Sequence, residues 1–212
     1  MNFFGHAAVA AWRSGDPSFV LGAMLPDFAS MIRARPPETL GARLSAGVAF
    51  HHATDELFHD VVAFRELCGE GFEQLSAAGL ARGSARAVAH VGVEILLDGV
   101  LADERAARRA YLTAIGEAAA RPEACVWQSA LEARAFRDLI AAMQARGVSR
   151  QHTSPAVVAL RVERALAGRP RLALQQRELP AVEAWADAAS HSVRLKSPAI
   201  TAALASFAAS TS

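Results

Sequence analysis

Apolar positions recur along the chain with helical spacing, in segments separated by short stretches that contain proline, glycine and charged residues. Alanine is abundant, aromatic residues make up only 7%, and the β-branched runs that are typical of strands are rare. The pattern therefore predicts helices throughout. Their expected positions are about 2–12, 42–67, 84–102, 103–119, 123–145, 155–167, 178–192 and 197–208, with one more helix within 19–32 and a short one between the stretches CGEGF and GLARGS.

Prolines and capping residues set the expected helix boundaries. Pro26 is predicted to end or kink its helix just before Asp27, because proline has no amide hydrogen and restricts the residue that precedes it. Ser84 is expected to cap the helix that follows it. Pro198 is expected to separate the last two helices.

Length and composition indicate a globular protein. The 212 residues are 52% hydrophobic and 20% charged, a profile typical of folded chains. We expect a single all-α domain over residues 1–212, built as a compact multi-helix bundle. Residues from about 1 to 102 would form one half of it, and residues from about 103 to 208 a helical C-terminal half.

Charge and cysteine content argue against a nucleic-acid-binding protein, a membrane protein and a protein held together by disulfides. The net charge of +1 gives no basic excess to favour nucleic acid or an anionic membrane surface. We expect no membrane span, because no stretch reaches roughly 18 uninterrupted apolar residues. Cys68 and Cys125 lie outside any CxxC motif, and the N-terminus does not look like a signal peptide, so we expect reduced thiols and a cytoplasmic protein.

The stretch VAFHHATDELFHDVV, residues 48–62, sets three histidines and three acids in one predicted helix. Steps of four place His51, Asp55 and His59 on one helical face, each about 40° further round. His52 shares a face with Asp55 and His59 equally well, so the choice between His51 and His52 stays open. By itself the stretch fits a solvated face, a buried polar network or one wall of a metal site.

A second stretch, AHVGVEILLDGVLA at residues 89–102, spaces His90, Glu94 and Asp98 by four residues each. The residues around this stripe are apolar nearly all the way round, which indicates a helix that is buried on most sides. A buried carboxylate needs an ion-pair partner or a metal ion. Two facing helices with imidazole and carboxylate stripes would meet that need at a metal site between them.

Asp27 and His6 complete the candidate site. Taken singly, Asp27 is more simply a helix cap, and His6 is more simply a hydrogen-bonded core histidine. Taken with the two stripes, they favour one shared metal site. The predicted ligands and their supporting residues are His6, Asp27, His51, His52, Asp55, His59, His90, Glu94 and Asp98.

The ligand types indicate both the ion and the chemistry. Imidazole and carboxylate without thiolate suit a divalent Mn²⁺, Zn²⁺, Fe or Mg²⁺ ion. More than four ligands would fit one octahedral ion or a pair of ions, and such sites activate water and stabilise charge on phosphoryl oxygens. We therefore predict phosphodiester hydrolysis, with Asp55, Asp98 and Arg65 as catalytic residues and Arg33 or Arg35 as a further phosphate-binding candidate.

Several short motifs, in the same order along the chain, resemble the acyl carrier protein phosphodiesterase family, which is HD-domain-like. MNFFGH matches the family's opening at Asn2 and His6, and GAMLPDF matches its motif at Asp27. His51, Asp55 and Arg65 match a later motif. Glu94 and Asp98 match an acid pair on a following helix, and GRPRL at 168–172 matches an Arg-Pro-Arg-Leu stretch.

This resemblance implies a helical hydrolase, typically using Mn²⁺, that releases 4′-phosphopantetheine from holo acyl carrier protein. A weaker resemblance joins the chain to zinc-dependent phospholipase C and related nucleases, through the spacings His51–Asp55 and His90–Glu94. A third interpretation is a non-catalytic helical protein whose histidine and acid network binds metal structurally. His152 and His191 are isolated and are expected to be structural or surface residues.

Overall fold

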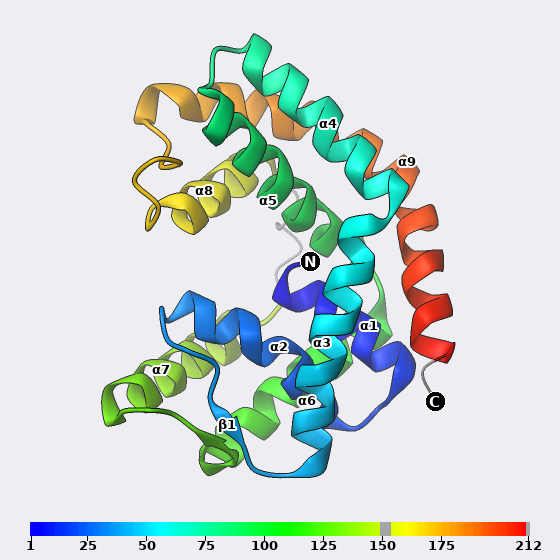
Figure 1. The fold of residues 1–212 in the computed structure, drawn as a ribbon, viewed down its shortest axis with the longest axis vertical. Helices are drawn as coiled ribbons and strands as arrows, with labels where there is room; N and C mark the ends of the chain where they lie inside the picture. Colours follow the sequence, from blue (N-terminus) through cyan, green and yellow to red (C-terminus); the bar gives the residue numbers. More distant parts are fainter. Residues whose placement is uncertain (149–153, 211–212) are drawn as a thin grey trace. The chain divides into compact units, whose positions relative to one another are not determined.

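The computed structural model describes residues 1–148 and 154–210, and helices dominate it (Figure 1), which confirms the predicted all-α class. The helices are α1 (Phe3–Arg13), α2 (Pro17–Met31), α3 (Ala42–Asp60), α4 (Val62–Ala77), α5 (Arg82–Leu101), α6 (Arg105–Ala120), α7 (Ala130–Arg146), α8 (Pro155–Leu166) and α9 (Leu179–Ser210), with 3-10 turns η1 (Pro122–Ala124) and η3 (Gln176–Glu178). Two short antiparallel strands, β1 (Glu38–Thr39) and β2 (Cys125–Val126), pair with each other.

The chain divides into two compact units, and each collects segments that are far apart in sequence. Unit 1 contains Met1–Leu57, Leu101–Ser149 and Leu204–Ser212, and unit 2 contains Phe58–Val100 and Arg150–Ala203. Each unit therefore draws on residues before and after position 102, where the sequence pattern suggested a division into halves.

The core of unit 1 lies where α1, α2 and α6 pack against one another, with α7 against α6 (Figure 1). Phe4 on α1 meets Tyr111 on α6 with ring centroids 5.4 Å apart. Phe28 on α2 meets Phe136 on α7 at 6.4 Å. These four side chains are buried, and the removal of their apolar surface from water is the main force that holds the helices together.

Two glycines allow α2 and α3 to cross closely in unit 1. A Cβ on Gly22 would lie 2.1 Å from the carbonyl oxygen of Leu44, and a Cβ on Gly47 would lie 2.2 Å from that of Phe19. No larger residue fits at either position without moving a backbone. The crossing sets the turn of α2 after Gly22 beside the turn of α3 that carries His51.

Unit 2 is held by a tryptophan that packs against glycines on two helices. Trp185 on α9 is buried, and its ring lies 3.1 Å from where a Cβ on Gly71 of α4 would be and 2.4 Å from where one on Gly92 of α5 would be. The indole therefore occupies the space that side chains on α4 and α5 would need. Gly92 lies between His90 and Glu94, so this contact also positions the histidine and acid stripe of α5.

The prediction of one helix from Ala42 to about Leu67 is wrong, because α3 ends at Asp60 and a second helix follows Val61. Val61 has an extended conformation, with φ −61° and ψ 122°, and α4 starts at Val62. Two consecutive β-branched residues have low helix propensity, which favours a break at this point. The glycines of CGEGF do not end a helix either, since α4 continues to Ala77 and uses Gly71 to admit Trp185.

Prolines interrupt the helices less than the sequence predicted. α2 runs through Pro26 to Met31, so Asp27 lies inside a helix and not at its end. α9 runs through Pro198, where two helices were expected. Packing on neighbouring elements outweighs the missing backbone hydrogen bond in both places.

Two predicted helix starts are also corrected. Ser84 does not cap α5, since it is buried inside that helix, which begins at Arg82. α7 begins at Ala130 and not near 123, because Ser129 and Glu132 form a reciprocal capping box.

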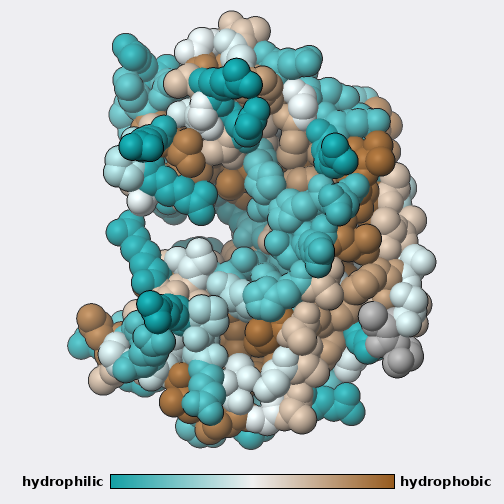
Figure 2. Space-filling model, viewed as in Figure 1, coloured by the Kyte–Doolittle hydropathy of each residue, from teal (hydrophilic) through white to brown (hydrophobic). Residues whose placement is uncertain are grey.

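Hydrophilic and hydrophobic residues are interspersed on the face seen in Figure 2. Large exposed apolar side chains include Leu131 on α7 and Leu195 on α9. Within residues 1–148 and 154–210, no helix is both long and apolar enough to cross a membrane.

Candidate metal centres

The structure sorts six of the predicted ligands into two groups, one in each unit. In unit 1, ligand atoms of His6, Asp27 and His51 all lie within 4.8 Å of one another, and we call these residues the His6 group. In unit 2, His59, His90 and Glu94 meet the same limit, and we call them the His59 group. Imidazole and carboxylate ligands of this kind bind divalent transition-metal ions.

The His6 group is assembled from three helices of unit 1. α1 supplies His6, α2 supplies Asp27 and α3 supplies His51. His6 is 1% exposed and His51 7%, and their rings stack with centroids 3.8 Å apart. Asn2, which the family resemblance singled out, caps α1 by accepting a hydrogen bond from the amide of Phe3 at 3.0 Å. The cap therefore secures the first turns of the helix that carries His6.

A backbone carbonyl determines the tautomer of His51. The Nδ1 atom of His51 lies 2.8 Å from the carbonyl oxygen of Ala23. A carbonyl can only accept, so Nδ1 carries the proton and Nε2 keeps its lone pair. Ala23 follows Gly22, so the close helix crossing is what brings this acceptor within reach.

A buried hydroxyl lies beside Nδ1 of His6. Thr54 donates its hydroxyl to backbone carbonyls of its own helix, with 2.8 Å to Phe50 and 3.0 Å to His51. Nδ1 of His6 lies 3.4 Å from the same hydroxyl oxygen. In the tautomer that carries its proton on Nδ1, His6 presents the lone pair of Nε2, the arrangement found in metal-binding histidines whose other nitrogen is hydrogen-bonded.

Asp55 lies beside the His6 group, one helical turn after His51. Its Oδ1 lies 3.4 Å from Nε2 of His6 and accepts a hydrogen bond from the N-terminal ammonium of Met1 at 2.6 Å. Burial raises the pKa of this carboxyl, but the hydrogen bonds and charges of His6 and Met1 outweigh that effect and hold it well below its usual range. Asp55 is therefore an anion at neutral pH.

Burial has the opposite consequence for His51. Removal from water and the neighbouring charge of His6 lower the pKa of the His51 imidazole to about 3. His51 is therefore neutral at physiological pH, which is the form that binds a metal ion.

The three ligand atoms of the His59 group lie close to one another. Nε2 of His59 lies 3.2 Å from Nε2 of His90, and Oε1 of Glu94 lies 3.6 Å and 3.1 Å from these two nitrogens. His59 comes from the end of α3, and α5 supplies the other two residues one turn apart. Burial raises the pKa of the Glu94 carboxyl, but hydrogen bonds from His59 and His90 outweigh it and lower that pKa.

Aromatic rings support the two imidazoles of the His59 group. The imidazoles stack at 18° with centroids 5.0 Å apart, and the ring of Phe64 meets their edges at 5.5 Å and 5.3 Å. Phe58 packs on Phe64 at 4.1 Å, and both phenylalanines are buried. The break at Val61 turns α4 so that Phe64 can reach His59, five residues earlier in the chain.

The other predicted site residues lie outside both groups. Asp98 is buried and forms an ion pair with Arg161 of α8 at 3.8 Å. Apart from the half-buried Asp55, the remaining predicted residues that the structure describes are exposed. They are His52, Arg65, Arg33, Arg35 and the isolated His191. His152 lies outside the described residues.

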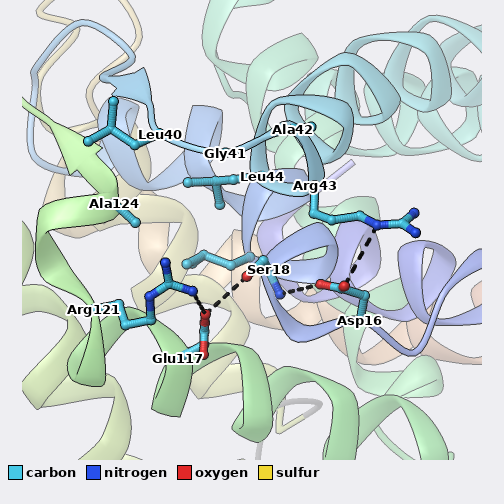
Figure 3. A pocket seen from close by; sticks show the side chains of 11 residues that line it. Asp16, Ser18, Leu40, Gly41, Ala42, Arg43, Leu44, Glu117, Arg121 and Ala124 are labelled. Atoms are coloured by element: carbon cyan, nitrogen blue, oxygen red, sulfur yellow. Dashed lines mark hydrogen bonds and ion pairs between the residues drawn. The ribbon is translucent and has the colours of Figure 1, made fainter.

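Unit 1 also contains a pocket of about 350 Å³ that no sequence motif indicated (Figure 3). Its charged side chains pair with one another, since Glu117 accepts hydrogen bonds from Ser18 at 3.0 Å and Arg121 at 3.2 Å. Asp16 lies 3.9 Å from Arg43 on the other side. These pairings leave little uncompensated charge to recognise a ligand.

Sequence reasoning missed the supporting groups of both centres. The carbonyl of Ala23 has no sequence signature, because any residue supplies a carbonyl. Thr54 and Phe64 have side chains that are common in helices, and only three-dimensional proximity reveals their roles. The glycines at positions 22 and 47 were the one available signal, since glycine inside a predicted helix often marks a close backbone approach.

Comparisons with known proteins do not identify a family for this chain. No family model matches the chain, and neither a curated protein nor a solved structure matches it. The function is therefore inferred from the two groups and from the short motifs described above.

Proposed function

We propose that this protein is a metal-dependent phosphodiester hydrolase whose catalytic ion is bound by the His6 group. The observation that carries the proposal is the convergence of two buried imidazoles and a carboxylate, with the Nδ1 atoms of both imidazoles in contact with other groups of the protein. Hydrogen bonds to the second ring nitrogen orient the first toward a metal ion and are a common property of metal-binding histidines.

The residues of the site fit a divalent ion in number and type. His6, Asp27 and His51 would hold it, and Asp55 is an anion close enough to balance its charge or to supply a further oxygen. Mixed nitrogen and oxygen ligands suit Mn²⁺, Fe or Zn²⁺. When bound, such an ion lowers the pKa of a water molecule and stabilises negative charge on phosphoryl oxygens.

The protein side chains have separate roles in this proposal. His51 stays neutral and Asp55 stays anionic over the neutral pH range, so neither is suited to deliver a proton to the leaving group. Their role is to bind and to balance charge. The resemblance to acyl carrier protein phosphodiesterases makes holo acyl carrier protein the first substrate to test, with release of 4′-phosphopantetheine as the reaction.

The test combines metal analysis with two assays. Purified protein loaded with Mn²⁺ is incubated with a chromogenic phosphodiester and, separately, with holo acyl carrier protein, and loss of phosphopantetheine is read by mass spectrometry. We expect Asp27→Asn and His6→Ala to lower hydrolysis by at least about 100-fold, because each removes a ligand worth several kcal/mol in the transition state.

His52→Ala is the matched control, since His52 is exposed and lies next to His51 on the same helix. Its activity should stay within about threefold of the unaltered protein. A protein that binds no divalent ion, or that binds one and hydrolyses neither substrate, would overturn the proposal. In the second case the site would be a structural metal centre.

A further inference from the structure

We propose that unit 2 carries a cation site of its own, in which His59, His90 and Glu94 bind one Zn²⁺-class ion and leave a fourth coordination position open. This site goes beyond the hydrolytic function proposed for the His6 group. All three ligands belong to unit 2, and none of them is needed to assemble the ligands of unit 1.

The spacing of the three ligand atoms matches tetrahedral coordination. Ligands of a tetrahedral ion with bonds of about 2.05 Å lie about 3.3 Å apart. The observed separations among Nε2 of His59, Nε2 of His90 and Oε1 of Glu94 are 3.2, 3.1 and 3.6 Å. An ion at about 2.05 Å from all three atoms would lie about 0.7 Å out of their plane, as a tetrahedral centre with three protein ligands requires.

The three atoms are already held at this spacing by polar contacts. Nε2 of His59 and Nε2 of His90 both lie within reach of Oε1 of Glu94 and of each other. An imidazole whose Nε2 is deprotonated presents a lone pair there. A single cation can therefore take the place of these protons and bind all three atoms at once.

Exposure indicates that the open position faces solvent. The side chains of His59 and His90 are 35% and 41% exposed, whereas that of Glu94 is 14% exposed. Water or an anionic ligand can therefore complete the coordination. Three protein ligands with one exchangeable position are typical of reactive zinc sites, while structural zinc sites use four protein ligands.

The surroundings hold the ligands in place. Phe64 packs against both imidazoles and is only 2% exposed, so the rings rest on a fixed apolar floor. His90 and Glu94 are one turn apart on α5, and Trp185 holds that helix at Gly92 between them. An apolar layer under a metal site limits the access of solvent and lowers the local dielectric constant.

The experiment uses Co²⁺ as a spectroscopic substitute for Zn²⁺. The metal-free full-length protein is titrated with Co²⁺, and the intense visible absorption of four-coordinate Co²⁺ is recorded. We expect His90→Ala and the nearly isosteric Glu94→Gln to weaken the Co²⁺ binding that produces this absorption by at least about 100-fold. Loss of a residue that only supports a ligand costs up to about 100-fold in metal affinity, and loss of the ligand itself should cost more. His191→Ala removes an exposed histidine from the same unit and should leave the titration unchanged.

Asp27→Asn separates this proposal from the hydrolytic one. It should abolish hydrolysis and keep the four-coordinate Co²⁺ absorption, whereas His90→Ala should remove the absorption. The proposal of this site would be refuted if the absorption persisted in both His90→Ala and Glu94→Gln. It would also be refuted if only Asp27→Asn removed the absorption. Should His90→Ala fail to fold, NMR of the unaltered protein decides, because Zn²⁺ must shift the imidazole resonances of His59 and His90.

Discussion

The His6 group and the His59 group share their ligand types and differ in how those ligands are held. The imidazoles of His6 and His51 are almost fully buried, and a hydroxyl and a backbone carbonyl hold their Nδ1 atoms. The imidazoles of the His59 group are more than one third exposed and are held by stacking on each other and on Phe64.

This difference separates two ways of preparing a metal site. Hydrogen bonds to a buried imidazole select its tautomer as well as its orientation, so the site is ready for an ion before one arrives. Aromatic packing restrains the plane of a ring and leaves its protonation open to the solvent. We therefore expect the His6 group to exchange its ion slowly and the His59 group to exchange it quickly.

The largest expected effect comes from the glycine crossing of unit 1. Gly22→Ala places a Cβ 2.1 Å from the carbonyl oxygen of Leu44, so α2 and α3 must move apart. We expect the free energy of unfolding to fall by about 3 kcal/mol. Metal affinity at the His6 group should fall with it, because Ala23 would move away from His51. Urea unfolding and metal titration measure the two effects.

Gly116→Ala in α6 is the control for this substitution, since its Cβ would have nothing within 4 Å. Alanine is the better helix former, so this variant should be more stable by up to about 1 kcal/mol. Equal stabilities for the two variants would contradict the close crossing.

The corresponding change in unit 2 is Gly92→Ala. Its Cβ would lie 2.4 Å from the indole of Trp185, and we expect a loss of about 2 kcal/mol together with weaker Co²⁺ binding at the His59 group. Gly69→Ala in α4 is the control, because its Cβ would have nothing within 4 Å. Metal binding at the His6 group should be the same in both variants, and a loss there would show that the two groups do not depend on separate packing contacts.

The buried imidazole of His51 predicts a pH dependence of stability in the metal-free protein. Its pKa is 6.5 in an exposed state and about 3 in the folded protein. Between these values the unfolded chain binds a proton that the folded chain does not, so the free energy of unfolding falls as the pH is lowered from 6.5 toward 3. His51→Gln should flatten this slope, whereas His52→Gln should not. Unfolding curves with a slope unaffected by His51→Gln would contradict the burial of a neutral ring.

A smaller effect is expected from Thr54→Val, which removes the hydroxyl beside Nδ1 of His6 at nearly constant volume. Loss of such a supporting residue lowers metal affinity by about 10- to 100-fold. Thr54→Ser keeps the hydroxyl and should restore most of the affinity, and the His59 group should be unaffected. Competition titrations with a chelator measure these affinities, and an unchanged affinity in Thr54→Val would refute the role given to the hydroxyl.

The smallest effect concerns the two thiols, one in each unit. Burial raises the pKa of Cys125 in unit 1 to about 12, and burial together with the charge of Glu94 raises that of Cys68 in unit 2 to about 12. Both thiols therefore stay protonated at pH 8 and should react slowly with a disulfide reagent. The two labelling rates, read by mass spectrometry, report how often each unit opens. Rates equal to those of the unfolded chain would contradict the protection of the buried Cys125 and the half-buried Cys68.

Local patterns correctly predicted the helical class, and they also supplied the residue types of the candidate ligands. Periodicity depends on nearest neighbours in a helix, and the metal-binding capacity of His90 or Glu94 is a property of the side chain alone. The steps of four on α5 correctly placed His90 and Glu94 on one face, where they contact each other at 3.1 Å.

Those patterns could not predict that the candidate ligands form two separate groups. His51 and His59 fall on one predicted face, yet the first joins residues of α1 and α2 and the second joins residues of α5. Tertiary packing decides which partner each imidazole meets. Packing likewise carries α2 through Pro26, where local propensity alone would end a helix.

The last turns of α9 complete the packing of unit 1 from the far end of the sequence. Phe207 stacks on Phe50 at 6.1 Å, and the carbonyl of Ala208 accepts a hydrogen bond from Arg13 at 3.4 Å. During synthesis, α1 and α3 leave the ribosome long before this covering segment exists. Phe50 and Arg13 therefore gain these partners only after α9 has been translated, so unit 1 cannot complete its packing before the end of synthesis.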